Sequence, residues 1–148
     1  MSFEKKLLGK NYHNLDAKGR IIVPAKYRDK LGSIFVAAKS LDKKCITVYP
    51  LPEWNKMEEK LLEMSNFNKN AMRVRRYLFT NAYDCETDPQ GRFLIPSDLR
   101  EYAGITKEAV TSGMGSFIEI WSKEEWQLNG PDVDGIDDDV LNELSELG

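Results

Sequence analysis

The sequence has few of the residues on which enzymes, metal sites and disulfide-rich proteins depend. It contains one histidine, His13, and two cysteines, Cys45 and Cys85, which do not form a C-x-x-C motif. It also has no glycine-rich phosphate-binding motif. We therefore expect no catalytic residue, no metal, no cofactor and no small-molecule substrate, and we interpret both cysteines as small buried residues.

Long apolar runs are also missing. Runs such as Ile21–Val23 and Phe93–Ile95 are far shorter than the roughly 20 residues that cross a bilayer. Residues 1–10 contain lysines but no apolar segment typical of a secretory signal. A hydrophobic content of 41% and a charged content of 30% are typical of a globular protein. We expect a cytoplasmic protein with no membrane partner.

Basic residues are scarce in the second part of the chain. Residues 1–80 contain 17 lysines and arginines against 8 acidic residues, whereas residues 81–148 contain 4 against 16. The segment 131–148 has seven acidic residues and no basic one. The net charge of −3 therefore conceals a basic N-terminal region, which is compatible with a polyanionic partner such as nucleic acid.

The chain contains an internal repeat with an offset of 72 residues. Asp16–Pro24 (DAKGRIIVP) aligns without a gap with Asp88–Pro96 (DPQGRFLIP). The same offset matches one arginine and one tryptophan of each copy, Arg28 with Arg100 and Trp54 with Trp126. We predict a first unit at 7–54, a helical connector at 55–78, a second unit at 79–126, and an acidic tail at 127–148 that is partly disordered.

Each unit is predicted to consist of short strands and short helices. The expected strands are 7–14, 21–23, 34–38 and 45–49 in the first unit, and 80–86, 93–95, 109–112 and 117–121 in the second. The expected helices are 24–31, 96–103, one from residue 52, one at 70–79 and one from residue 122. The apolar runs Ile21–Val23 and Phe93–Ile95 are interpreted as strands buried on both faces.

A unit of about 48 residues buries too little surface to be stable alone. We therefore favour interleaved units and assembly into an oligomer over a monomer with two separate halves.

The repeated D-x-x-G-R turn carries the candidate binding residues. Asp16 and Asp88 can accept backbone N–H bonds within the turn, and Gly19 and Gly91 can adopt positive φ. A turn stiffened in this way can present its third and fifth residues, which are Lys18 and Arg20 in the first copy and Gln90 and Arg92 in the second. A rigidly presented guanidinium suits phosphate and guanine recognition. The other interpretation is a plain hairpin in which aspartate and arginine pair with each other.

These motifs resemble the signatures of the MraZ family of bacterial transcriptional regulators. The resemblance rests on Asn14–Arg28 and Asp88–Arg100, with further matches at Tyr49–Trp54, Arg73–Arg76, Ile118–Trp121 and Trp126. It also extends to the single-copy AbrB-type swapped-hairpin domain. It implies a mainly β fold with short helices (α+β), in which two tandem AbrB-like swapped-hairpin units form a pseudo-symmetric double β unit and subunits assemble into a ring.

The resemblance also implies a function and a set of functional residues. It implies a sequence-specific DNA-binding regulator, mainly a repressor, that binds direct repeats upstream of the division and cell-wall gene cluster, its own gene included. Such a protein is a homo-oligomer in the cytoplasm, associated with the nucleoid, and is not an enzyme. The implied DNA contacts are Lys18, Arg20, Gln90, Arg92, Arg28 and Arg100, and the loop-organising residues are Asp16, Gly19, Asp88 and Gly91. The alternative is an AbrB-like antitoxin or scaffolding protein whose main partner is another protein.

Several other residues have more than one interpretation. Arg28 and Arg100 either contact DNA or pair with their neighbours Asp29 and Glu101. The cluster Arg73–Arg76 faces phosphate, a neighbouring subunit or solvent. Trp54 and Trp126 are interpreted as core residues.

The acidic tail has two features of its own. Asp132–Asp139 is superficially similar to a calcium-binding loop but lacks the required glycine at position six. Four apolar residues can form one or two amphipathic turns, and the tail charge can compete with DNA for the basic loops: Val140, Leu141, Leu144 and Leu147.

Overall fold

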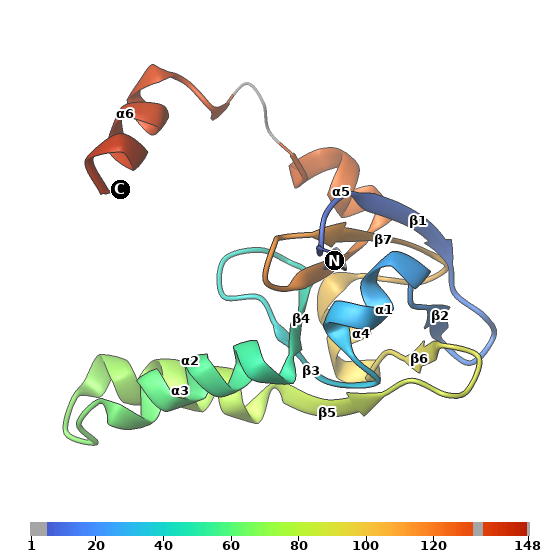
Figure 1. The fold of residues 1–148 in the computed structure, drawn as a ribbon, viewed down its shortest axis with the longest axis horizontal. Helices are drawn as coiled ribbons and strands as arrows, with labels where there is room; N and C mark the ends of the chain where they lie inside the picture. Colours follow the sequence, from blue (N-terminus) through green and yellow to red (C-terminus); the bar gives the residue numbers. More distant parts are fainter. Residues whose placement is uncertain (1–5, 132–134, 148) are drawn as a thin grey trace, which may run out of the picture.

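The computed structural model describes residues 6–131 and 135–147. The strands of this part of the chain are β1 (Lys10–Asn14), β2 (Arg20–Ile22), β3 (Ile34–Lys39), β4 (Ile46–Pro50), β5 (Ala82–Glu86), β6 (Arg92–Leu94), β7 (Glu108–Gly113) and β8 (Ile118–Ser122). The helices are α1 (Ala25–Leu31), α2 (Leu51–Glu63), α3 (Lys69–Thr80), α4 (Ser97–Ala103), α5 (Lys123–Asn129) and α6 (Asp138–Leu147). Figure 1 shows the labelled strands gathered in one body with α1, α4 and α5, while the α2–α3 hairpin and α6 project from it.

Most of the strands belong to one six-stranded sheet in which the two units are interleaved. The strand order is β1-β7-β8-β4-β3-β5, and each paired neighbour is antiparallel. Each unit sends its first strand to the hairpin of the other, because β1 pairs with β7 and β5 pairs with β3. The fold class is thus confirmed as a mainly antiparallel β structure with short helices, built from two tandem units. The exact unit boundaries stay predictions.

The remaining two strands form a separate ribbon, in which β2 of the first unit pairs with β6 of the second. This ribbon covers one face of the large sheet together with α1 and α4, and the main core lies between them. Phe35 of β3 and Phe93 of β6 meet edge to face in this core, with ring centroids 5.0 Å apart. Each buried aromatic ring contributes about 1.5–3 kcal/mol through removal from water, so the interleaved units stabilise one another.

The expectation that Ile21–Val23 and Phe93–Ile95 are buried on both faces is wrong. The central residue of the first run, Ile22, is 56% exposed, and the matching Leu94 is 57% exposed, whereas the residues on either side of each are buried. The reason is that the β2–β6 ribbon lies on the outside of the molecule, with only one face turned to the core. Its second face is open, and alternate side chains point outward along it.

The short helices α1 and α4 end where the sequence predicts and begin one residue later than predicted. Pro24 and Pro96 directly precede α1 and α4, and Gly32 and Gly104 follow them. The α2–α3 hairpin covers the opposite face of the sheet with a second apolar cluster, in which Trp54 is buried. The interpretation of Trp54 as a core residue is therefore confirmed.

Two first strands are shorter than predicted. Residue 80 ends α3, so the first strand of the second unit begins at Ala82. In the first unit Leu7 makes only an isolated bridge to Gly115, and the strand begins after Gly9, whose φ of +80° turns the chain.

Two helices, α5 and α6, account for much of the described part of the tail. Ser122 begins α5 by accepting a hydrogen bond from the Glu125 backbone N–H at 3.0 Å, as the capping pattern predicts. Further on, α6 extends for ten residues with none of them buried, which is longer than the one or two turns expected. Asp132–Asp134, at the start of the calcium-like stretch, lie outside the described residues.

Within residues 6–131 and 135–147, no helix combines the length and apolarity needed to cross a membrane.

Candidate nucleic-acid interface

The first D-x-x-G-R turn, residues 16–20, is stiffened by its aspartate. One carboxylate oxygen of Asp16 accepts the backbone N–H groups of Lys18 and Arg20, at 3.0 and 2.9 Å. The backbone closes the turn as well, because the Gly19 N–H donates to the Asp16 carbonyl at 3.0 Å. Gly19 has a φ of +83°, which L side chains rarely adopt. We call this turn the first loop.

The second copy of the turn, residues 88–92, repeats this geometry and is called the second loop. Asp88 accepts the backbone N–H groups of Gln90 and Arg92 at 3.0 and 2.8 Å. The Gly91 N–H donates to the Asp88 carbonyl at 2.9 Å, and Gly91 has a φ of +78°. The two loops differ at the second and third positions of the D-x-x-G-R pattern. Their common conformation is thus encoded by the aspartate, glycine and arginine that they share.

The two loops are hydrogen-bonded into one platform. The Val23 N–H of the first unit donates to the Gly91 carbonyl at 2.9 Å, and the Ile95 N–H of the second donates to the Gly19 carbonyl at 3.2 Å. The β2–β6 ribbon joins the loops directly, with Arg20 opposite Leu94 and Ile22 opposite Arg92. The relative position of the loops is therefore fixed by backbone contacts.

Each loop arginine also pairs with the aspartate of its own loop. The Arg20 Nε donates to Asp16 Oδ2 at 2.7 Å, and the Arg92 Nε donates to Asp88 Oδ2 at 2.6 Å. The pairing that a plain hairpin would have is thus present, but it engages the inner guanidinium nitrogen. The side chains of Arg20 and Arg92 stay 24% and 33% exposed. The aspartates therefore orient the guanidiniums without burying them.

The loop aspartates are held in the charged form. Hydrogen bonds from the Arg20 backbone, and then from its side chain and from Lys18, lower the pKa of Asp16 below its ordinary 3.8 against a desolvation effect that raises it. Partial desolvation is the largest effect on the pKa of Asp88 and raises it, but the hydrogen bonds and charge of Arg92 together outweigh it and the pKa is lowered. Both carboxylates are thus ionised at neutral pH and hold their loops closed.

The helix arginines lie against the loop of the opposite unit. A Cβ placed on Gly91 would come within 2.6 Å of the Arg28 guanidinium carbon, and one placed on Gly19 would collide with the Arg100 guanidinium. Arg28 is anchored by a 2.9 Å hydrogen bond from its Nε to the Val23 carbonyl. The first loop therefore gathers Lys18, Arg20 and Arg100, and the second loop gathers Gln90, Arg92 and Arg28.

The outward face of the ribbon joins these two clusters. Arg20 and Ile22 project from β2 on the side away from the core, and Leu94 and Arg92 project from β6. The sequence interpretation missed Ile22 and Leu94 as surface residues of the site. Strand alternation could have revealed both residues. Ile22 is two residues after Arg20 and Leu94 is two residues after Arg92, so each lies on the same face of its strand as its arginine.

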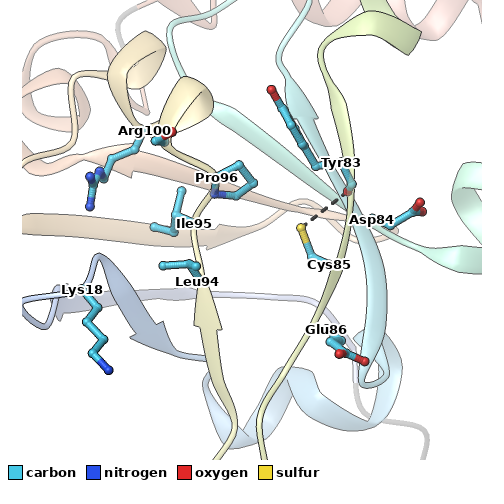
Figure 2. Close-up of a pocket in the computed structure, with 10 residues that line it drawn as sticks. Lys18, Tyr83, Asp84, Cys85, Glu86, Leu94, Ile95, Pro96 and Arg100 are labelled. Carbon is cyan, nitrogen blue, oxygen red and sulfur yellow. Dashed lines mark hydrogen bonds between the residues drawn. The ribbon is translucent and has the colours of Figure 1, made fainter.

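The surroundings of the two loops differ. A cavity of about 510 Å³ beside the first loop is lined by Lys18 and Arg100 and by residues of β5 that include Asp84 and Glu86. Figure 2 shows the two cationic side chains on one side of it and the β5 strand on the other. The 72-residue offset puts Tyr12 and Asn14 at the places of those carboxylates in the first unit. The first loop therefore has more cationic side chains than the second loop, and it also has the carboxylates of β5 nearby.

Other residues that the sequence singled out lie outside this site or within the core. The buried thiols of Cys45 and Cys85 have raised pKa values, about 11 for Cys85, through desolvation. His13 shares a 2.8 Å hydrogen bond with Thr111 Oγ1, and burial lowers its pKa. Trp126 packs edge to face on Trp121. No cluster of three histidine, cysteine or acidic side chains that could hold a metal is found within the described ranges.

The basic cluster of α3 is divided. Arg73 and Arg76 are exposed, while Arg75 is partly buried and donates to Asn66 Oδ1 at 2.7 Å. The exposed Arg73 and Arg76 are accessible to phosphate, a neighbouring subunit or solvent, the three environments that the sequence suggests.

The fold and the site together define a protein made of two swapped-hairpin units that present a pair of rigid arginine loops on one surface. A family described as "MraZ protein, putative antitoxin-like" matches residues 7–77 and 78–128. The chain belongs to the MraZ family, as its similarity to individual relatives also shows.

These relatives are proteins named transcriptional regulator MraZ. The one from Halothermothrix orenii is 50% identical over 80% of this chain and 82% of its own length. The one from Lachnoclostridium phytofermentans is 47% identical over 95% of this chain and 96% of its own, and that from Clostridium beijerinckii is 46% identical over 95% and 98%.

Proposed function

We propose that this protein is a DNA-binding transcriptional regulator that uses the paired loops as its DNA-contacting surface. The names of its relatives support this class of function. The observation that carries the proposal is the convergence of a loop arginine and a helix arginine of the opposite unit at each loop. Guanidiniums fixed in this way lose little conformational entropy on binding phosphates or guanine edges.

The contacts divide into two roles. Lys18 is exposed at the tip of the first loop and can neutralise phosphate, while Gln90 takes its place in the second loop and can donate or accept a hydrogen bond. Arg20 and Arg92 lie beside Ile22 and Leu94 on the ribbon, and one terminal nitrogen of Arg92 donates to Gln90 Oε1 at 3.0 Å. Apolar side chains in that position can contact thymine methyl groups. Arg28 and Arg100 complete the two clusters.

We further propose that the protein assembles into a ring and binds direct repeats upstream of the division and cell-wall gene cluster, mainly as a repressor of that cluster and of its own gene. One loop pair offers few phosphate contacts, so a single chain would bind weakly and be sensitive to salt. Several loop pairs on one oligomer would engage successive repeats with a high effective concentration. Such a regulator would reside in the cytoplasm on the nucleoid.

The test is a fluorescence-anisotropy titration of the protein with a DNA fragment from upstream of its own gene. Arg20→Ala is expected to weaken binding roughly 5- to 150-fold, because a good arginine–base contact contributes about 1–3 kcal/mol. Lys18→Ala is expected to weaken binding to all sequences and to lower the salt slope by about one.

The matched control is Lys56→Ala, which removes an exposed lysine from α2 on the projecting hairpin and is expected to leave affinity unchanged. Light scattering of each variant checks that the oligomer is intact. Wild-type affinity of Arg20→Ala and Arg92→Ala would refute the assigned surface.

A second candidate function is an AbrB-like antitoxin or scaffolding protein, which the "antitoxin-like" wording of the family description favours. It predicts a stoichiometric protein partner that co-purifies with the chain. Retention of that partner by Arg20→Ala would separate this function from DNA binding.

A further inference from the structure

The helix α6 has a stripe of apolar residues with no surface to cover it. Val140, Leu141, Leu144 and Leu147 recur at helical spacing, and all four are exposed. Asp137 begins the helix by accepting the Val140 N–H at 3.0 Å. A helix of ten residues is marginal in water by itself, because helices shorter than about 12–15 residues gain too little from their own hydrogen bonds. A docking surface would supply the missing stability.

A groove of about 520 Å³ with matching chemistry lies between α3 and the turn that joins β3 to β4. Its lining consists of Leu41 from the turn and Asn70, Arg73, Val74 and Tyr77 from α3. The three apolar members of this lining are exposed. The groove is preformed, because the Tyr77 hydroxyl donates to the Ser40 carbonyl at 3.3 Å and holds the turn against α3.

The charges of the two surfaces are complementary. The sequence of α6 contains four acidic residues and no basic one. The groove contains Arg73, and the turn beside it carries the exposed Lys43 and Lys44. An acidic amphipathic helix therefore finds both apolar contacts and opposite charge there.

The tail starts beside the same turn. A neighbouring cavity is lined by Asp42 and Lys43 of the turn together with Gly130 and Pro131, which follow α5. From Pro131 to Asp137 the chain has seven residues, which can span up to about 25 Å. The segment between α5 and α6 therefore starts next to residue 42. The preceding residue, Leu41, lines the groove.

We propose that this groove is the docking site of α6 from the same chain. Val140, Leu141 and Leu144 cover Leu41, Val74 and Tyr77, and the acidic residues of α6 face Arg73 and Lys43. The surface lies on α3 rather than on the D-x-x-G-R loops, so this inference is independent of DNA binding. It differs from a general attraction of the acidic tail to the basic loops, because it requires an apolar contact at one defined place.

Disulfide trapping in the full chain tests the proposal. The double variant Val74→Cys/Leu144→Cys is expected to form an intrachain disulfide under mild oxidation within minutes, at a rate at least tenfold above the control Leu62→Cys/Leu144→Cys. Leu62 is also exposed and belongs to the neighbouring helix α2, outside the groove. The native thiols are buried, so the unsubstituted chain serves as the blank.

A mixture of the two single variants, Val74→Cys and Leu144→Cys, identifies the occupant. If disulfide-linked dimers form in that mixture as fast as the intrachain disulfide forms in the double variant, a second copy fills the groove. That result would overturn the proposal. Equal rates for the double variant and its control would overturn it as well.

Hydrogen exchange provides a measurement without cysteine. The α6 amides are expected to exchange at least tenfold faster in Val74→Glu than in the wild type, and at the wild-type rate in Leu62→Glu. Equal exchange of α6 in all three proteins would contradict docking.

Discussion

The substitution Gly19→Ala separates the role of the cross-unit arginine from loop stability. The φ of +83° at Gly19 disfavours any L side chain by about 1–2 kcal/mol. In addition, the new methyl group would occupy the place of the Arg100 guanidinium, whose central carbon lies 3.0 Å from the Cβ position. Because a guanidinium is the end of a flexible side chain, we expect it to swing away at little further cost to folding.

The size of the effect on binding follows from that displacement. Loss of one well-placed arginine contact costs about 1–3 kcal/mol, which is roughly a 5- to 150-fold loss of DNA affinity at 25 °C. The strain in φ lowers the free energy of unfolding by about 1–2 kcal/mol, which for a chain of this length is a decrease in Tm of roughly 2–8 °C. The affinity and the stability are thus expected to change by separable amounts.

The control is Gly115→Ala, and the assays are thermal unfolding and anisotropy with upstream DNA. Gly115 has a φ of +88°, and a Cβ there would meet nothing within 4 Å. It therefore carries the same backbone strain without displacing an arginine, and is expected to lower Tm by a similar amount while DNA affinity stays unchanged. Equal affinities of the two variants would refute the role of Arg100 at the first loop.

Two further predictions concern the loop carboxylates and the ribbon. Because the pKa values of Asp16 and Asp88 are lowered on folding, their stabilising effect is complete above the ordinary value of 3.8 and is lost as pH falls through the lower folded values. Carboxyl NMR titration should therefore show midpoints below 3.8, and midpoints above it would contradict the hydrogen-bonded loops. Phe93→Ala is expected to lower the free energy of unfolding by about 3–5 kcal/mol, whereas Leu94→Ala, next to it on the open face, is expected to change it by less than about 0.5 kcal/mol. Denaturant unfolding measures both, and similar losses would refute the one-sided burial of β6.

The local parts of this structure could be predicted from the sequence because their causes are local. The Asp16 turn is closed by hydrogen bonds between residues no more than four apart, so the pattern D-x-x-G-R specifies it wherever it occurs. The proline before α1 and the glycine after it likewise act through their own backbone preferences. Interleaving of the units was expected from their small size and from the family resemblance, but the strands that they exchange were not, since strand partners distant in sequence leave no local signal.

The open face of the ribbon was missed for a different physical reason. A run of three apolar residues contains one and a half periods of strand alternation, which is too short to distinguish one-sided from two-sided burial. The alternation becomes visible only when the run is read together with Arg20 or Arg92, whose charge requires an exposed position. The candidate binding residues and the burial pattern are therefore linked in the sequence.

Because the two units are interleaved, a substitution in one copy of the repeat can act on the cluster at the loop of the other copy. Because Arg100 lies against Gly19 and Arg28 against Gly91, each cluster contains side chains from both units. A substitution in one loop therefore alters one cluster only, while a substitution in one helix alters the cluster of the other unit. The pair Lys18 and Gln90 shows such a divergence, since the first cluster has one cation more than the second. A tandem chain can in this way give its two loops different affinities or base preferences, which a symmetric dimer of single units cannot do.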